Sequence, residues 1–297
     1  MKIAFVTDTG TGHDPDYWKE RGIYCLPLQI EYNGNSYDEY VTIPYAKVIE
    51  NLHEQVLMKT SLPKPGLMED LFEDLKKEGY DAIFCVPICK GLSSTYDTLE
   101  MMAKEADLQF YGVDCYVTAV VQGRMIEIAK EMIESGHTIE ETIARLERIA
   151  QSCETILLCD DLQHMKRGGR LTPTAAVLGG LLKIKPVLII LGEKLDAYAK
   201  ARTVKQAKSV MLTAIQKELE TRLHDGECRR CHLAIAHTNN EEAALEFKKE
   251  VAERYPYADV IMAPLSLSIA CHIGPGSLAV TATRKMDEEY EEDHGAV

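Results

Sequence analysis

Four short segments of the chain combine hydroxyl, imidazole or guanidinium side chains with glycine or proline. They are residues 60–66, 91–95, 166–170 and 272–276. Hydroxyls and backbone amides at the start of a helix can hold an anion, and a histidine can donate a hydrogen bond to a carboxylate. Each segment also has an ordinary structural explanation, because Ser and Thr cap helices and Gly and Pro form turns. Taken singly, none of them defines a site.

Two of these segments place hydroxyls where parallel sheets bind ligands. Ser93 and Ser94 follow a strand predicted at residues 81–87, and Thr60 and Ser61 precede a predicted helix. In doubly wound sheets, ligands gather outside the carboxyl ends of the strands, where loops lead into helices. The four hydroxyls are therefore candidate anion-binding groups.

The remaining two segments contribute a histidine and a basic loop. His272 precedes Gly274 and Gly276, which would let the backbone approach a ligand closely. Arg170 follows paired glycines in a basic loop, which suggests phosphate or partner contact, although a surface turn explains the loop equally well.

The first half of the chain alternates predicted strands and helices. The strands are residues 2–7, 24–32, 81–87 and 110–114, and the helices are residues 44–58, 65–77, 92–106, 119–135 and 138–151. This order is typical of an α/β domain with a mostly parallel sheet and helices on both faces. Asn33-Gly34 predicts a hairpin turn.

The second half has an α+β pattern. The predicted strands are residues 155–159, 186–191, 195–199, 232–237, 258–262 and 267–270, and the helices are residues 175–182, 204–223 and 241–254. We place the boundary in the charged stretch 148–154. The prediction is an N-terminal α/β domain, residues 1–153, and a C-terminal α+β domain, residues 154–297.

Composition excludes several classes of function. The net charge of −14 counts against binding to nucleic acid or to anionic membrane surfaces, which require clustered Lys and Arg. No apolar run reaches the roughly 18 residues of a membrane span, and no signal peptide precedes the first strand. We therefore expect a soluble, cytoplasmic protein.

Nine cysteines are present, which in a reducing compartment are usually small buried hydrophobes. Cys228, Cys231 and His232 have the spacing of a haem-attachment motif and of half a zinc site. Haem attachment needs export, and no second cysteine pair has the spacing to complete a zinc site. We favour a chance surface pair and expect neither a metal nor a cofactor.

In their order along the chain, these segments resemble the motifs of the DegV family, whose members are similar to the acyl-binding subunits of bacterial fatty-acid kinase. The matching residues are 3–8, 60–63, 91–96, 160–162, 167–171, 182–186, 200–203, 236–237 and 272–276. The resemblance implies a two-domain fold with a long-chain fatty acid between the domains.

The resemblance also implies roles for individual residues. The carboxyl group would be held by Thr60, Ser61, Ser93 and His272, beside which we include Ser94 as a candidate ligand-binding residue. Arg170 would lie near the site where an ATP-dependent kinase partner works. Such a cradle needs few fixed charges, because hydroxyls, amides and one imidazole replace the water that the carboxylate loses.

The chain departs from the family pattern at several positions. Thr9 and Gly10 replace the usual Ser-Thr after Asp8, Ser94 replaces a common glycine, and Leu62 replaces a glutamine. These departures leave the residues implied for binding the carboxyl group in place. They bear instead on the preferred length of the acyl chain and on the identity of the kinase partner. Residues 175–182 and 187–191 could line an acyl tunnel or simply form core.

Two enzymatic alternatives stay open at this point. A serine hydrolase for acyl esters would use Ser93 as nucleophile and His272 as base, but the sequence identifies no acid to orient the histidine. A kinase or phosphocarrier would be expected to carry a Gly-x-x-x-x-Gly-Lys-Ser/Thr loop, which is absent from the sequence. We favour a lipid-binding protein without catalytic residues of its own.

Overall fold

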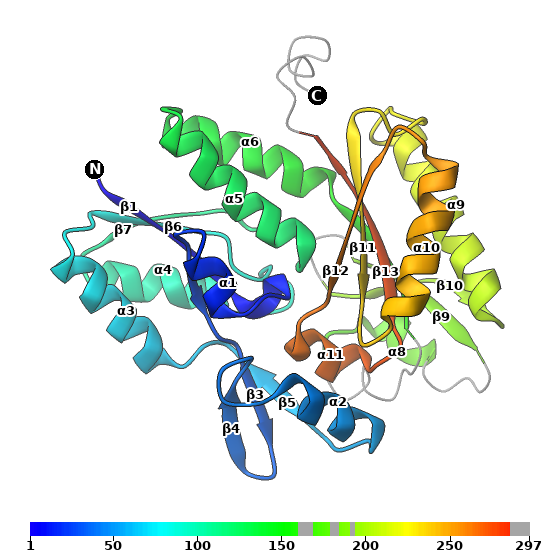
Figure 1. Cartoon of the computed structure of the whole chain (residues 1–297), viewed down its shortest axis with the longest axis horizontal. Helices are drawn as coiled ribbons and strands as arrows, with labels where there is room; N and C mark the ends of the chain where they lie inside the picture. Colours follow the sequence, from blue (N-terminus) through cyan, green and yellow to red (C-terminus); the bar gives the residue numbers. More distant parts are fainter. Residues whose placement is uncertain (160–168, 179–183, 191–193, 286–297) are drawn as a thin grey trace.

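The computed structural model describes residues 1–159, 169–178, 184–190 and 194–285, which form three sheets with helices packed around them (Figure 1). The first sheet is wholly parallel and has the order β2 (Tyr24–Leu26), β1 (Ile3–Asp8), β6 (Ala82–Cys85) and β7 (Gln109–Gly112). β1 and β6 form its centre and are buried along nearly their whole length, as expected for a parallel sheet covered on both faces.

The second sheet is mixed and has six strands. Their order is β10 (Asp196–Ala201), β9 (Lys185–Ile190), β8 (Glu154–Leu158), β13 (Leu278–Arg284), β11 (Cys231–His237) and β12 (Asp259–Pro264). Only β11 and β12 run parallel to each other. A small third sheet, the hairpin sheet, consists of β4 (Asn35–Asp38), β3 (Gln29–Tyr32) and β5 (Lys59–Ser61).

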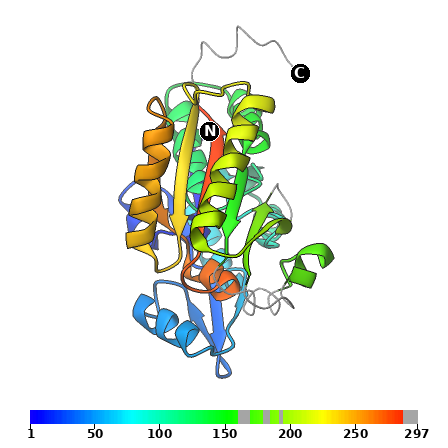
Figure 2. The ribbon, with the colours of Figure 1, turned by 90° about the vertical axis from the view of Figure 1, so that its right-hand side faces the viewer.

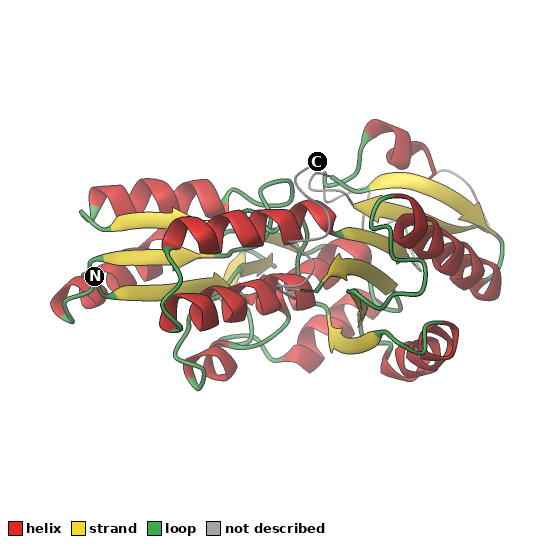
Figure 3. Cartoon of the chain, turned by 90° about the horizontal axis from the view of Figure 1, so that it is seen from above, coloured by secondary structure: helices red, strands yellow, loops and turns green. Residues whose placement is uncertain are grey.

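Helices separate and cover the sheets in layers (Figures 1 and 3). α3 (Pro65–Lys77) and α4 (Thr95–Glu105) cover the outer face of the first sheet, and α9 (Val204–Thr221) and α10 (Glu241–Arg254) cover that of the second. Between the sheets lie α5 (Val120–Glu134) and α6 (Ile139–Ser152), whose side chains share one large hydrophobic core with both. The predicted α/β class is confirmed.

Shorter helices lie around the hairpin sheet and the ends of the two large sheets. They are η1 (Thr9–Thr11), α1 (Pro15–Lys19), α2 (Tyr45–His53), α8 (Pro173–Leu178) and α11 (Leu267–Ile273). The hairpin sheet projects beyond the larger sheets, with α2 and α11 beside it (Figures 1 and 2). Its core joins Ile30 and Val48 to Leu267 and Cys271 of α11.

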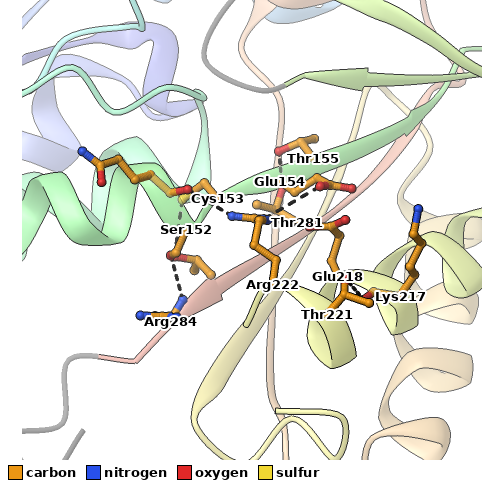
Figure 4. A network of polar contacts seen from close by, with 12 residues as sticks. Ser152, Cys153, Glu154, Thr155, Lys217, Glu218, Thr221, Arg222, Thr281 and Arg284 are labelled. Atoms are coloured by element: carbon orange, nitrogen blue, oxygen red, sulfur yellow. Dashed lines mark hydrogen bonds and ion pairs between the residues drawn. The ribbon is translucent and has the colours of Figure 1, made fainter. Parts of the chain in front are cut away.

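The domain boundary after residue 153 stays a prediction. All strands of the first and hairpin sheets precede it, and all strands of the second sheet follow it. Polar contacts fix the chain where it passes from α6 into β8 (Figure 4): Ser152 Oγ accepts from Arg284 N at 3.2 Å, and Arg222 Nη1 donates to the carbonyl oxygen of Gln151 at 3.0 Å. Burial and the neighbouring Glu218 raise the pKa of Glu154 to about 8.

The structure differs from the predicted elements at several positions. The predicted strand at 267–270 is wrong, because Ser266 accepts a hydrogen bond from Ile269 N and starts the helix α11. The extended stretch 24–32 is divided at Pro27 between two sheets. No strand was predicted at Leu278–Arg284, yet β13 lies in the middle of the second sheet.

The surface placement predicted for the Cys228/Cys231 pair is also wrong. Both side chains are buried, with exposed fractions of 0% and 1%. Cys228 Sγ contacts the carbonyl oxygen of Cys231 at 3.6 Å. Contact with Cys228 and burial raise the pKa of the Cys231 thiol far above its usual value. The pair is therefore part of the core of the second sheet, where an unreactive thiol is expected.

The loop after β1 makes a close contact with the end of β12, and this contact generates a prediction. Gly12 has a φ of +87°, and a Cβ atom there would lie 2.4 Å from the carbonyl oxygen of Pro264. Gly34, in the β3–β4 turn, has a similar φ of +76° but open space around it. Gly34→Ala should cost about 1 kcal/mol for the left-handed backbone alone. Gly12→Ala should cost distinctly more, on the order of 3 kcal/mol, because the clash with backbone adds to the strain.

Urea unfolding of the two variants measures this difference. Equal losses of stability would show that the loop can move away from β12 without cost.

Candidate functional site

A cavity of about 270 Å³ lies where the first sheet, the hairpin sheet and the second sheet meet. It lies at the carboxyl end of the first sheet, where ligands bind in open α/β sheets. One part of its wall is polar and consists of Thr60, Ser61, Ser93, Ser94, Arg170, Ser268 and His272. The other part is apolar and consists of Leu28, Leu62, Ile88, Leu92, Leu195, Ile269 and Ile273.

All six residues predicted for the site line this one cavity. They come from β5, from the turn before α4, from the segment that precedes α8, and from α11. The apolar segments suggested for an acyl tunnel do not contribute described residues to the wall: Ala175 and Val187 lie in hydrophobic cores. Residues 160–168, 179–183 and 191–193, which include parts of three matched motifs, lie outside the described residues.

Thr60 and Ser61 lie side by side on β5 but do not play the same part. Thr60 Oγ1 is hydrogen-bonded to His272 Nε2 at 2.6 Å. Successive side chains of a strand point to opposite faces. Accordingly, the Ser61 hydroxyl donates to Glu31 Oε1 at 3.3 Å, and its residue is exposed. Thr60 is therefore the better placed hydroxyl for a ligand in the cavity.

Ser93 and Ser94 are held by the tight turn between β6 and α4. Ser93 N donates to the carbonyl oxygen of Cys89 at 3.1 Å, and Ser93 Oγ lies 2.8 Å from Thr95 Oγ1. Ser94 directly precedes α4, but its side chain makes no capping hydrogen bond. The ordinary capping explanation for this serine therefore does not hold, and its exposed hydroxyl is available beside the cavity.

The helix α11 supplies a second polar residue that the sequence did not indicate. Ser268 and His272 are four residues apart, as are Ile269 and Ile273, so that the helix presents both pairs to the cavity. The signal was present in this i, i+4 spacing. It was missed because residues 267–270 were interpreted as a strand, in which the spacing has no such meaning.

The charge of the site is set by His272 and Arg170. Burial, together with the positive charge of Arg170, lowers the pKa of His272 to about 4, so its ring is neutral near pH 7. Arg170 lines the same cavity, and its Nε donates to the carbonyl oxygen of Leu92 at 3.5 Å. Within the described residues, the wall of the cavity thus combines neutral polar groups with one cation.

Two buried carboxyl groups lie behind the cavity wall. Asp8 accepts hydrogen bonds from Gly10 N at 2.8 Å, Ile88 N at 2.8 Å and Gln122 Nε2 at 3.0 Å. Burial raises the pKa of Asp8 to about 6 and that of Glu39 to about 7. Glu39 accepts from Ser268 N, which places a carboxyl group directly behind α11. Nothing in the sequence around Glu39 indicates that it is buried.

This geometry gives little support to hydrolysis by a Ser93–His272 pair. His272 Nε2 bonds to Thr60, and Ser93 Oγ to Thr95. A histidine with a pKa of about 4 is a weak base, and no carboxylate within the described ranges hydrogen-bonds to its ring. In the same part of the chain, no group of three or more His, Cys, Asp or Glu residues could hold a metal ion, and no helix is long and apolar enough to cross a membrane.

The lowered pKa of His272 predicts how the protein's stability depends on pH. Its folded-state pKa of about 4 lies below the 6.5 of an unfolded histidine, so the unfolded state binds more protons between these values. The contribution of His272 to stability is therefore lost as the pH falls from about 6.5 to 4. Between pH 7 and pH 4 the stability of the glutamine variant relative to wild type should therefore rise by up to about 3 kcal/mol.

Urea unfolding of wild type and His272→Gln across this range measures the effect. Only the difference between the two is informative, since the raised pKa values of Asp8 and Glu39 act in the opposite direction. A difference that does not vary with pH would contradict the assignment of a neutral, buried ring.

Comparison with known proteins agrees with this architecture. A family model described as "Uncharacterised protein, DegV family" matches residues 2–285. Protein DegV of Bacillus subtilis is 29% identical over 284 residues, which cover 94% of this chain and 98% of that protein.

Two solved structures extend the similarity to the fold. The fatty-acid-binding DegV family protein of Streptococcus agalactiae has a TM-score of 0.84 at 26% identity, covering 96% of this chain and 99% of that one. A Thermus thermophilus DegV family protein described by its fatty acid binding has a TM-score of 0.84 at 28% identity, covering 96% and 100%. These matches confirm the resemblance found in the sequence: the chain belongs to the DegV family.

Proposed function

We propose that this protein binds a long-chain fatty acid in the cavity between its sheets. The observation that carries the proposal is the composition of the wall, in which hydroxyls and an imidazole lie at one part and aliphatic side chains at the other. A molecule with one acidic group and an apolar remainder fits such a wall. The fatty acid binding named for two structural relatives supports the same ligand class.

The energetics favour an acyl chain as the main source of affinity. Each buried methylene contributes about 0.8 kcal/mol, so a chain of about sixteen carbons could contribute on the order of 10 kcal/mol before the costs of association. The carboxylate loses its hydration on entry, and this loss is unfavourable unless donors replace the water. In the proposed complex Ser93, Ser94 and His272 supply those donors and Thr60 donates to the ring of His272, with Ser61 at the margin and the charge of Arg170 close by.

A neutral His272 suits this role. The neutral ring carries one N–H donor, and its other nitrogen can accept from the Thr60 hydroxyl. In that arrangement the N–H would donate to the carboxylate. The approach of an anion would in turn favour the protonated ring, so that binding would raise the pKa of His272.

We further propose that the protein presents its fatty acid to a separate ATP-dependent kinase and does not itself catalyse a reaction. In this scheme Arg170, at the edge of the cavity, lies near the carboxyl group on which the partner acts. No cofactor other than the bound lipid is required, and a cytoplasmic location is predicted for this protein. An acyl-ester hydrolase is the alternative that the experiments below would reveal.

Analysis of the purified protein tests the proposal directly. Gentle denaturation and mass spectrometry should release a long-chain fatty acid in a near-stoichiometric amount, and incubation with labelled ATP alone should label neither protein nor lipid. The absence of any acyl ligand, together with no acyl binding in titration, would refute the function. Labelling without a partner, or ester turnover that vanishes in Ser93→Ala, would show that the protein is an enzyme.

The headgroup assignment predicts a graded set of binding losses. Ser93→Ala, His272→Ala and Thr60→Val each remove a hydrogen-bonding group next to a carboxylate, which should weaken acyl binding about 10- to 100-fold. Ser61→Ala is the matched control, since its hydroxyl contacts Glu31, and it should cost less than about threefold. Titration with a fluorescent fatty acid measures all four, and unchanged affinity in the first three would show that the carboxyl group binds elsewhere.

A further inference from the structure

The carboxyl group of Glu39 contacts two elements that build the wall of the cavity. Glu39 follows the β3–β4 hairpin and is fully buried, with an exposed fraction of 0%. Its Oε1 accepts from Ser268 N at 2.7 Å, and its Oε2 accepts from the hydroxyl of Thr9. Thr9 Oγ1 in turn accepts from Leu28 N at 2.9 Å. Both Ser268 and Leu28 line the cavity, so one carboxyl group connects two parts of its wall.

The helix α11, whose Ser268 N–H donates to Glu39, is too short to be stable without tertiary contacts. α11 has seven residues, four of which line the cavity. Helices of this length are unstable in isolation and depend on tertiary contacts. The apolar face of α11, which includes Leu267 and Cys271, packs on the hairpin core. Apolar packing is not directional, so it leaves small shifts of the helix possible.

Two polar contacts, one near each end of α11, remove that freedom. At the first turn Ser268 N donates to Glu39, and in the last turn His272 bonds to Thr60. The Ser268 N–H belongs to the first turn of the helix, where backbone donors have no partner within the helix. Glu39 supplies that partner from a distant part of the sequence.

We propose that Glu39 is a positioning residue for the site: by holding the first turn of α11 it sets His272 in contact with Thr60. The part of the proposal that concerns ligand affinity rests on the proposed function. The part that concerns the position of His272 does not, because it can be measured in the ligand-free protein.

Asp8 and Glu39 occupy different places in this arrangement. Asp8 holds Ile88, another lining residue, through the Ile88 N–H. It makes no contact with α11 that would replace that of Glu39. Cys25, Tyr40 and Cys271 are the other titratable groups that sense the charge of Glu39. A protonated carboxyl or an amide can still accept from Ser268 N through its carbonyl oxygen, so the contact itself does not require the charged form.

This property provides a test with a conservative rescue. Glu39→Met keeps the buried volume but removes both acceptors, whereas Glu39→Gln keeps an acceptor for Ser268. Ring signals of His272 in the NMR spectrum of the ligand-free protein should shift in Glu39→Met and stay near their wild-type positions in Glu39→Gln. Affinity for a fluorescent fatty acid should fall about tenfold or more in the first variant and less than threefold in the second.

Glu154→Met is the control for the general loss of a buried carboxyl group. Glu154 is 3% exposed and lies in the second sheet, outside the cavity wall. Its replacement can alter stability but should leave the His272 signals and the acyl affinity unchanged. If Glu39→Met does not fold, Ser268→Pro compared with Ser268→Ala tests the same contact from the donor side. Both lose the hydroxyl, and only proline, which the first turn of a helix tolerates, also loses the N–H.

Unchanged His272 signals in folded Glu39→Met, or in Ser268→Pro relative to Ser268→Ala, would overturn the positioning role. Equal shifts in Glu39→Met and Glu154→Met would do the same, because they would indicate a general loss of structure. Failure of the wild-type protein to bind any fatty acid would refute the proposed function instead, while the NMR comparison would still decide whether Glu39 positions His272.

Discussion

A single hydrogen bond between Thr60 and His272 joins parts of the chain that are 212 positions apart, and the candidate site depends on it. It brings a strand of the hairpin sheet against α11, whose other residues complete the wall of the cavity. Loss of the contact would leave two partly buried polar groups without this hydrogen bond, which is unfavourable. The contact therefore favours one arrangement of three sheets that share no backbone hydrogen bonds in the described ranges.

Much of the fold could be predicted because local patterns and tertiary structure agree there. The bounds of α3 and α10 match the predicted helices, and the positive φ values of Asn33 and Gly34 match the predicted turn. β13 could not be predicted, because its mixture of apolar, small and hydroxyl residues is buried at nearly every position and its partners are distant in the sequence. α11 was mistaken for a strand for the same reason: seven residues are too few to distinguish a helix from a strand by period.

Most polar residues of the cavity wall could be predicted, but Ser268 and the electrostatics of the site could not. Hydroxyls and glycines at the ends of strands indicated Thr60, Ser93 and His272, and the structure brings them to one cavity. The neutral state of His272 and the burial of Glu39 depend on long-range packing, which no local pattern contains. In the proposed complex an acidic protein accepts an anion, which requires a local exception to its overall charge. Arg170 supplies a positive charge at the cavity, where the low dielectric of the interior strengthens its effect.

The shared core between the two large sheets constrains how a ligand could enter. α5 and α6 pack against both sheets, and side chains such as Phe5, Met125 and Leu157 belong to one continuous cluster. Separating the sheets would expose that cluster to water, which costs about 1.5–3 kcal/mol for each large side chain. Exposing only a few such side chains would therefore cost as much as the whole free energy of unfolding of an ordinary domain. α11, in contrast, is held by its contacts with Thr60 and Glu39 and by the small core that it shares with β3 and α2. Displacing α11 would therefore expose less apolar surface than separating the two large sheets, so a ligand of the proposed kind would enter more readily by a local shift of α11.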